Sequence, residues 1–270
     1  MPEFLYVSNS FVPYNYPVEE AEVIFLGIPF SSTSISDSSA YGPVMVREAL
    51  KLIEGLDQKS GLDFTNLKIC DLGDVEIVPG SYELTAERVR ETIKQIRELN
   101  SKAFLVILGG EHLVTLPVVE SLKPKTIIQL DAHRDLRNDY LGNAYSHATW
   151  ARRAKDNLNC DIIQIGTREA SAEEIETEKQ LGIKKGPDAI KSASEPIYLT
   201  VDMDVFDPCY VETGFPVSNG LTPKEVFEII EKLKGKNVIG MDINEISSRE
   251  LPSKTGFLAA EVIRKVLASI

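Results

Sequence analysis

The chain is poor in cysteine, with only Cys70, Cys160 and Cys209 among its 270 residues. Their odd number, their wide spacing and the absence of a Cys-x-x-Cys pair exclude a disulfide framework and a cysteine zinc site. We therefore expect a reduced, cytoplasmic protein.

Long apolar runs and a leader-like N-terminus are also missing. The longest apolar run, Ala103 to Leu108, is far too short to span a bilayer, and the first residues lack both a basic segment and an apolar segment behind it. We expect no signal peptide and no membrane contact.

Basic residues are fewer than acidic ones, 29 against 41, which gives a formal net charge of −12. A sequence-independent nucleic-acid binder needs an excess of lysine and arginine to displace phosphate counterions. The charge argues against nucleic acid as a partner and favours a small cationic ligand.

What the chain does have is a regular alternation of short apolar runs and helical patterns. Val89, Ile93 and Ile96 have helical spacing, and Thr222-Pro223 is typical of a helix start. The alternation predicts an α/β fold, with a doubly wound, mostly parallel sheet, helices on both faces, and a single domain over residues 1–270. The runs expected as buried strands are Val23–Ile28, Leu67–Cys70, Phe104–Leu108, Thr126–Leu130, Asp161–Gly166, Ile197–Val201 and Val238–Met241.

Acids and histidines follow four of these strands. Ligands of such sheets sit beyond the carboxyl ends of the strands, so these residues are the first candidates for a site. The four segments are Gly109-Gly110-Glu111-His112, Asp131-Ala132-His133-Arg134-Asp135, Asp202-Met203-Asp204 and Asp242-Ile243-Asn244-Glu245.

The spacing within these segments points to a metal. In an extended segment Asp131, His133 and Asp135 would leave the chain on the same side, and Asp202 and Asp204 repeat the pattern. Several buried carboxylates on one face repel each other unless a cation is present. Four aspartates with His112 and His133 suit Mn²⁺, with Zn²⁺, Fe²⁺ and Co²⁺ as competitors, and their number favours two metals over one.

The same residue types also have simpler structural roles. A single buried histidine is usually a hydrogen-bonded structural residue, and a single Asp-x-Asp is more often a cap or turn. Here all three histidines of the chain lie between His112 and His147, each at or after a strand end. That clustering favours a functional site.

Several short motifs occur in order along nearly the whole chain. They are Gly27-Ile28-Pro29-Phe30, Tyr41-Gly42-Pro43, Asp71-Leu72-Gly73-Asp74, Gly109-Gly110-Glu111-His112, Asp131-Ala132-His133-Arg134-Asp135, Ser146-His147-Ala148-Thr149, Asp202-Met203-Asp204-Val205-Phe206-Asp207-Pro208 and Glu245. Taken together, these motifs resemble those of the ureohydrolases, a family that includes arginase and agmatinase. The resemblance implies a three-layer α/β/α fold, a cluster of two Mn²⁺ ions, and hydrolysis of a guanidinium compound to urea and an amine. The stretch from Leu136 to His147 is most similar to the agmatinase branch.

The resemblance also implies a role for each site residue. His112, Asp131, Asp135 and Asp202 would ligate one manganese, and His133, Asp131, Asp202 and Asp204 the other, with a hydroxide bridging the two ions. Glu245 would hold the guanidinium group. His147 would move protons or help protonate the departing amine, and Asp135 would pass a proton to the leaving nitrogen.

Two segments depart from the family pattern, and both are expected at the mouth of the pocket. Ser31–Ala40 lacks an Arg-Pro-Gly common in the family, and within 215–220 Val217 replaces a glutamate. Arg134 is unusual at a position that must point away from the metals. These departures affect the choice of substrate and not the metal chemistry. The agmatinase-like segment and the acidic net charge favour agmatine, with N1-aminopropylagmatine, guanidinobutyrate or arginine as alternatives.

Other classes of protein fit the sequence less well. A deacetylase-like enzyme would use a single zinc, a nucleotide-binding protein would need a phosphate-binding glycine loop that the chain lacks, and a non-catalytic family relative remains an alternative. By resemblance, the protein is expected to form a homo-oligomer, either a trimer or a hexamer.

Overall fold

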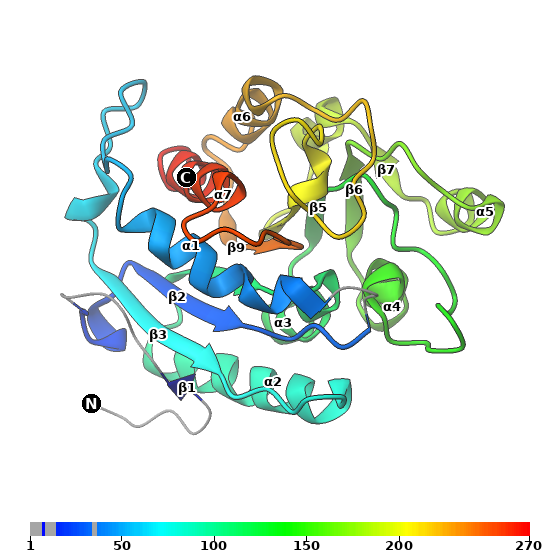
Figure 1. The fold of residues 1–270 in the computed structure, drawn as a ribbon, viewed down its shortest axis with the longest axis horizontal. Helices are drawn as coiled ribbons and strands as arrows, with labels where there is room; N and C mark the ends of the chain where they lie inside the picture. The colour runs from blue at the N-terminus through cyan, green and yellow to red at the C-terminus, as the bar shows by residue number, and fades with distance from the viewer. Residues whose placement is uncertain (1–6, 9–14, 34–36) are drawn as a thin grey trace.

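A computed structural model describes residues 7–8, 15–33 and 37–270, and its strands form one nine-stranded sheet (Figure 1). The order across the sheet is β1-β3-β2-β4-β9-β8-β5-β6-β7, and every pairing is parallel except that of β1 with β3. The strands are β1 Val7–Ser8, β2 Val23–Ile28, β3 Ile69–Val75, β4 Phe104–Gly109, β5 Thr126–Leu130, β6 Asp161–Ile165, β7 Lys184–Lys185, β8 Ile197–Asp202 and β9 Val238–Asn244.

The seven strands expected from apolar runs are all present. The largest differences are at β3, which begins later and continues to Val75, and at β9, which continues to Asn244. Polar residues such as Asp242 and Asn244 therefore lie inside β9 and not after it, because their side chains have buried partners. The edge strands β1 and β7 were not expected, since two residues are too short to show a periodic pattern.

Helices cover both faces of the sheet. One buried cluster joins α1, α6 and α7 to alternate residues of the strands, such as Val23 and Phe25. The other joins α2, α3 and α4 to the residues between them, such as Ile24 and Leu26. The three-layer, doubly wound α/β/α arrangement expected from the sequence is confirmed. The helices are α1 Gly42–Leu50, α2 Tyr82–Leu99, α3 Thr115–Leu122, α4 Trp150–Asn157, α5 Ala172–Gln180, α6 Pro223–Glu231 and α7 Lys254–Leu267.

Short 3-10 helices fill several of the connections. Two of them, η4 and η7, follow strands that carry candidate site residues. Within the described residues they are η1 Val18–Glu20, η2 Asp37–Tyr41, η3 Phe64–Asn66, η4 His112–Val114, η5 His147–Thr149, η6 Pro187–Ser192 and η7 Met203–Val205.

Four strands that are distant in sequence are neighbours in the sheet and end at one edge. The order β4-β9-β8-β5 places the segments after β4, β5, β8 and β9 side by side. Within it, Leu130 of β5 pairs with Val201 of β8, so that the next residues, Asp131 and Asp202, leave adjacent strand ends. This edge is where the candidate site lies.

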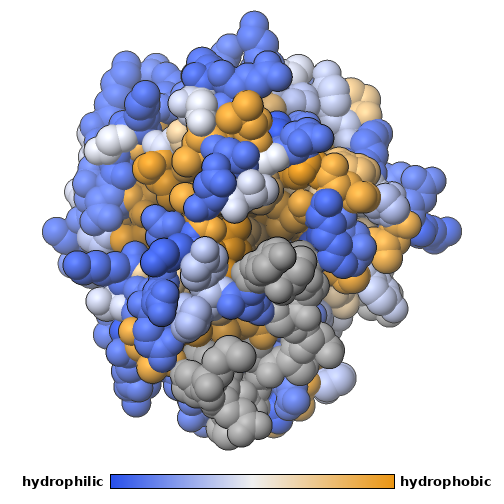
Figure 2. Space-filling model, turned by 90° about the vertical axis from the view of Figure 1, so that its left-hand side faces the viewer, coloured by the Kyte–Doolittle hydropathy of each residue, from blue (hydrophilic) through white to orange (hydrophobic). Residues whose placement is uncertain are grey.

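No helix among the described residues is long and apolar enough to cross a membrane. On the side shown in Figure 2, hydrophilic residues separate several apolar patches. Large exposed hydrophobic side chains in the described chain include Tyr41 and Leu52, each 62% exposed.

Candidate metal centre

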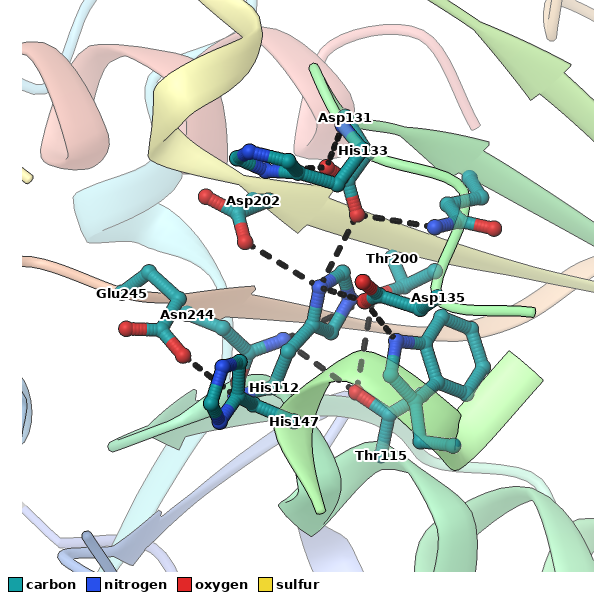
Figure 3. A network of polar contacts seen from close by, with 12 residues as sticks. His112, Thr115, Asp131, His133, Asp135, His147, Thr200, Asp202, Asn244 and Glu245 are labelled. Atoms are coloured by element: carbon teal, nitrogen blue, oxygen red, sulfur yellow. Dashed lines mark hydrogen bonds and ion pairs between the residues drawn. The ribbon is translucent and has the colours of Figure 1, made fainter. Parts of the chain in front are cut away.

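The expected site residues gather around one cavity of about 270 Å³ at the carboxyl ends of β4, β5, β8 and β9. Asp131 is fully buried beneath it, and Figure 3 shows how the side chains point toward one another. The expected residues that line the cavity are His112, His133, Asp135, His147, Asp202, Asp204 and Glu245.

Two groups of three side chains have the geometry to hold a cation. In each group the potential ligand atoms lie within 4.8 Å of one another, and Asp131 belongs to both. The first group is His112, Asp131 and Asp202, and the second is Asp131, His133 and Asp204. The structure therefore brings five of the six expected ligands into two adjoining groups, and the sixth, Asp135, has an oxygen 3.4 Å from Nδ1 of His112.

Nδ1 of His112 gives the clearest sign that a cation belongs here. It is buried and makes no hydrogen bond in the described part of the chain, although oxygens of Asp131 and Asp202 each lie 3.1 Å away. The other ring nitrogen, Nε2, lies 2.7 Å from the Thr200 hydroxyl. A histidine is typical of a metal ligand when one ring nitrogen is buried and points toward carboxylates while the other is held by a hydrogen-bonding partner.

The acidic segments reach this position by turns and not by strand alternation. Asp135 has φ +53°, and the Asp131 carboxylate accepts a hydrogen bond from the His133 backbone N–H at 2.6 Å. Asp202 is the last residue of β8 and accepts from the Asp204 N–H at 2.8 Å. The expectation of one extended segment with all three side chains on the same side was wrong for 131–135, yet the side chains converge.

The electrostatics of the cluster require positive charge. Burial, followed by the neighbouring carboxylates, raises the pKa of Asp135 and Asp202 well above the ordinary value. Burial works to lower the pKa of His133, but Asp204 outweighs it and raises that pKa to about 11. Without a cation the centre must hold protons, and divalent metals would replace them.

Three partners of the cluster were not expected from the sequence. Gln129 donates to Asp131 at 2.8 Å, Trp150 donates through Nε1 to Asp135 at 2.7 Å, and Thr200 contacts His112. All three are fully buried. The single tryptophan of the chain was a possible signal, but Gln129 and Thr200 lie within apolar strands and give none.

Glu245 follows β9 and lies in the cavity in an unusual backbone conformation. Its φ is +62°, a region that glutamate rarely adopts, and its carboxylate accepts from the His112 backbone N–H at 2.9 Å. Burial, and then the nearby Glu111, raises the pKa of Glu245 to about 8. A buried carboxyl group with a raised pKa is stabilised in its ionised form when a cationic ligand binds beside it.

His147 lies on another wall of the cavity. Its ring stacks on Phe215 with centroids 5.6 Å apart and meets the edge of Tyr140 at 5.0 Å. Burial, and then the charges of His133 and His112, lowers its pKa to about 4. The Thr33 hydroxyl lies 3.4 Å from its Nδ1.

The two segments expected at the mouth differ in what they contribute. Phe215 lines the cavity, but Val217 does not, and its carbonyl accepts from Arg168 at 2.7 Å. Of Ser31–Ala40, residues 34–36 lie outside the described residues. Arg134 points away from the metal ligands as required, since its Nε donates to Glu178 at 2.7 Å.

Comparisons with known proteins agree with this geometry. A sequence model described as Arginase family matches residues 21–269. The N(1)-aminopropylagmatine ureohydrolase of Thermococcus kodakarensis is 37% identical over 97% of this chain and 96% of that protein. The agmatinase of Pyrococcus horikoshii is 37% identical over 93% and 92% of the two chains. The crystal structure of agmatine ureohydrolase of Thermoplasma volcanium superposes with a TM-score of 0.85, at 33% identity, over 94% of this chain and 91% of that one.

Proposed function

The chain belongs to the arginase family, as its motifs indicated, and from this premise we propose that it is a manganese-dependent ureohydrolase that converts agmatine to putrescine and urea. The observation that carries the proposal is Nδ1 of His112, which is buried, makes no hydrogen bond among the described residues and lies 3.1 Å from oxygens of two carboxylates, at the edge where four strands end.

The ligands divide between two ions. His112, Asp131, Asp135 and Asp202 would hold one ion, while Asp131, His133, Asp202 and Asp204 would hold the other. Carboxylates mixed with histidines suit Mn²⁺, and four aspartates nearly neutralise two divalent charges. The ions would supply the charge that makes a water molecule nucleophilic near neutral pH.

Glu245 and His147 would handle the substrate. The Glu245 carboxylate can accept two N–H groups of a planar guanidinium, which fixes its central carbon in the cavity. His147 would move protons between the cavity and the departing amine. Asp135 would carry a proton to the leaving nitrogen.

Agmatine is proposed as the substrate because of the relatives and the walls of the cavity. Two relatives that are each 37% identical are named for agmatine or its aminopropyl derivative. Beyond the metal ligands, Glu169 and Glu174 line the cavity together with Arg137, whose Nε lies 3.7 Å from the Glu174 carboxylate. Because the charge of Arg137 is offset by Glu174, Glu169 gives this part of the cavity wall a net negative charge. That charge favours a substrate with a cationic tail.

The test is a competition between guanidines. Urea release would be measured with Mn²⁺ on agmatine, N1-aminopropylagmatine, guanidinobutyrate and arginine. We expect the highest kcat/KM with agmatine. A higher value with N1-aminopropylagmatine would favour that alternative substrate. A higher kcat/KM for arginine would overturn the proposed substrate, and no urea from any of the four would favour a non-catalytic relative.

We also propose one domain over residues 1–270, a cytoplasmic location and a homo-oligomer. All described strands belong to one sheet, and exposed hydrophobic side chains such as Tyr41 are available for subunit contacts. Light scattering that finds only monomers would contradict the trimer or hexamer.

A further inference from the structure

We propose that Thr33 and Glu111 are positioning residues, which hold His147 in the tautomer with the proton on Nδ1 and leave Nε2 to exchange protons with the cavity. The inference rests on the proposed function, in which His147 moves protons. Neither Thr33 nor Glu111 is a candidate metal ligand.

Glu111 is the fixed point of this arrangement. It is fully buried, and its carboxylate accepts from the backbone N–H groups of Ser32 at 3.0 Å and Thr33 at 2.8 Å. The Thr33 hydroxyl lies 2.7 Å from its other oxygen. In this short contact the Thr33 hydroxyl is the donor and the carboxylate oxygen is the acceptor.

The close approach of two strand ends makes these contacts possible. The Glu111 N–H donates to the Phe30 carbonyl at 2.9 Å. A Cβ at Gly110 would lie only 2.2 Å from that same carbonyl oxygen, so a side chain there would push the segments apart. Glycine before Glu111 thus lets the segment after β2 lie against the end of β4.

The Thr33 hydroxyl has one proton, and it donates that proton in a hydrogen bond to the Glu111 carboxylate. Toward His147 the same oxygen can then only accept, and it accepts from the His147 backbone N–H at 3.1 Å. Nδ1 of His147 lies 3.4 Å from the oxygen and must donate if it is to bond there. When Nδ1 donates to this oxygen, the ring proton is on Nδ1 and the lone pair is on Nε2.

One neighbouring group could oppose this tautomer. The Ser146 hydroxyl lies 3.3 Å from Nδ1 and could donate to it. Phe215 and Tyr140 hold the plane of the ring but do not distinguish its two nitrogens. The competing outcomes are therefore a proton on Nδ1, set by Thr33, or a proton on Nε2, set by Ser146.

The kinetic test compares three variants of the Mn²⁺-loaded enzyme in urea release from agmatine. Thr33→Val keeps the shape of the side chain and loses the hydroxyl, and since acid–base catalysis typically contributes about 10²–10⁴-fold, we expect kcat to fall ~10-fold to 100-fold with KM within ~2-fold. Thr33→Ser should restore kcat to within ~3-fold, because the hydroxyl returns. Ser32→Ala is the matched control. It keeps the backbone N–H that donates to Glu111, so its kcat should stay at the wild-type value.

A loss of kcat in Thr33→Ser as large as in Thr33→Val would overturn the proposal, and so would an unchanged kcat in Thr33→Val. Thermal melting of each variant separates these outcomes from a failure to fold.

The tautomer itself is read by ¹⁵N NMR of the histidine rings, with diamagnetic Zn²⁺ in the centre. The chain has only three histidines, and His147→Asn identifies the signals of His147. We expect a protonated Nδ1 in the wild type and in Thr33→Ser, and a mixture or the other tautomer in Thr33→Val. A wild-type proton on Nε2 would overturn the proposal. Because this measurement needs no turnover, it still decides the matter if agmatine is not hydrolysed.

Discussion

Two clusters of aspartates in this molecule have their negative charge balanced in opposite ways. Near β2 and β3, Arg47 is 4% exposed and binds Asp71 with Nε and Nη2 at 3.0 Å each, while its Nη1 pairs with Asp74. In the metal centre, among the described residues, the carboxylates of Asp131 and Asp202 have ion pairs only with histidines.

The difference separates a structural cluster from a binding site. The Arg47 cluster contains its own permanent cation, and Nη2 also donates to the Gly73 carbonyl at 2.7 Å. In the candidate metal centre the ion-pair partners of Asp131 and Asp202 among the described residues are histidines, which can lose their charge, and Nδ1 of His112 makes no hydrogen bond there. A set of buried acids that lacks a fixed cation is poised to take one from solution, whereas a set that includes one contributes to folding.

The largest effect should come from removing a carboxylate that is proposed to ligate both ions. We expect Asp131→Ala or Asp202→Ala to lower urea release by more than the ~10–100-fold that loss of an outer-shell partner costs. His112→Ala should be less severe, because it serves one ion. Metal analysis and urea assays check this, with the exposed Asp188→Ala as control. If Asp131→Ala retained both metals and activity, that result would contradict the assignment of this cluster as a metal-binding site.

Arg47→Met should mainly affect folding. Removing one partner of a buried ion pair leaves the other uncompensated, which costs about 3–5 kcal/mol of unfolding free energy. The more exposed Arg90→Met, which loses an ion pair with Glu120, should cost at most about 1 kcal/mol. Urea denaturation measures both. Equal losses in the two variants would show that the Arg47 cluster is not the structural one.

Metal addition should stabilise the protein, and more so as the pH rises. At a free metal concentration 100 times Kd, the expected gain is about 2.7 kcal/mol. In the metal-free protein the pKa of His133 is raised from 6.5 to about 11, so the stability that its proton contributes is full below 6.5 and is lost as the pH rises from there through about 11. Metal must displace such protons, so binding is weaker at low pH.

Thermal melting with and without Mn²⁺ at pH 6 and pH 8.5 checks this dependence. The rise in Tm should be larger at pH 8.5 in the wild type, and also in Arg47→Met if that variant folds. A rise that is equal at both values, or larger at pH 6, would contradict proton displacement.

The smallest effect is expected from Trp150→Phe. The change removes the indole N–H that donates to Asp135 and keeps most of the buried ring, so metal affinity should fall about tenfold. Tyr198→Phe is the matched control, because its hydroxyl donates at 3.0 Å to Asp242, outside the centre. Metal titration should show unchanged affinity in the control, and a similar loss in both would mean that the effect is general.

Much of the fold and the set of acidic and histidine side chains were predictable from the sequence. Apolar runs such as Thr126–Leu130 have the composition of buried strands, a property of neighbouring residues. The motif spacing identified Asp131, His133 and Asp204, because the residue types needed to bind metal are fixed locally. The path of 131–135 was not predictable in this way, since the positive φ of Asp135 arises from its surroundings.

By itself the sequence determined the alternation of strands and helices and the chemistry available at the strand ends. Only the tertiary structure decided which of those ends meet. The neighbours β4, β9, β8 and β5 are set by long-range packing, and so are the contacts of Thr200 with His112 and of Thr33 with His147. The same packing turned Asp242 away from the cavity toward Thr115 and Tyr198. Local patterns specify which groups a chain offers, but the hydrogen bonds that orient them join residues far apart in sequence, and these form only when the layers pack.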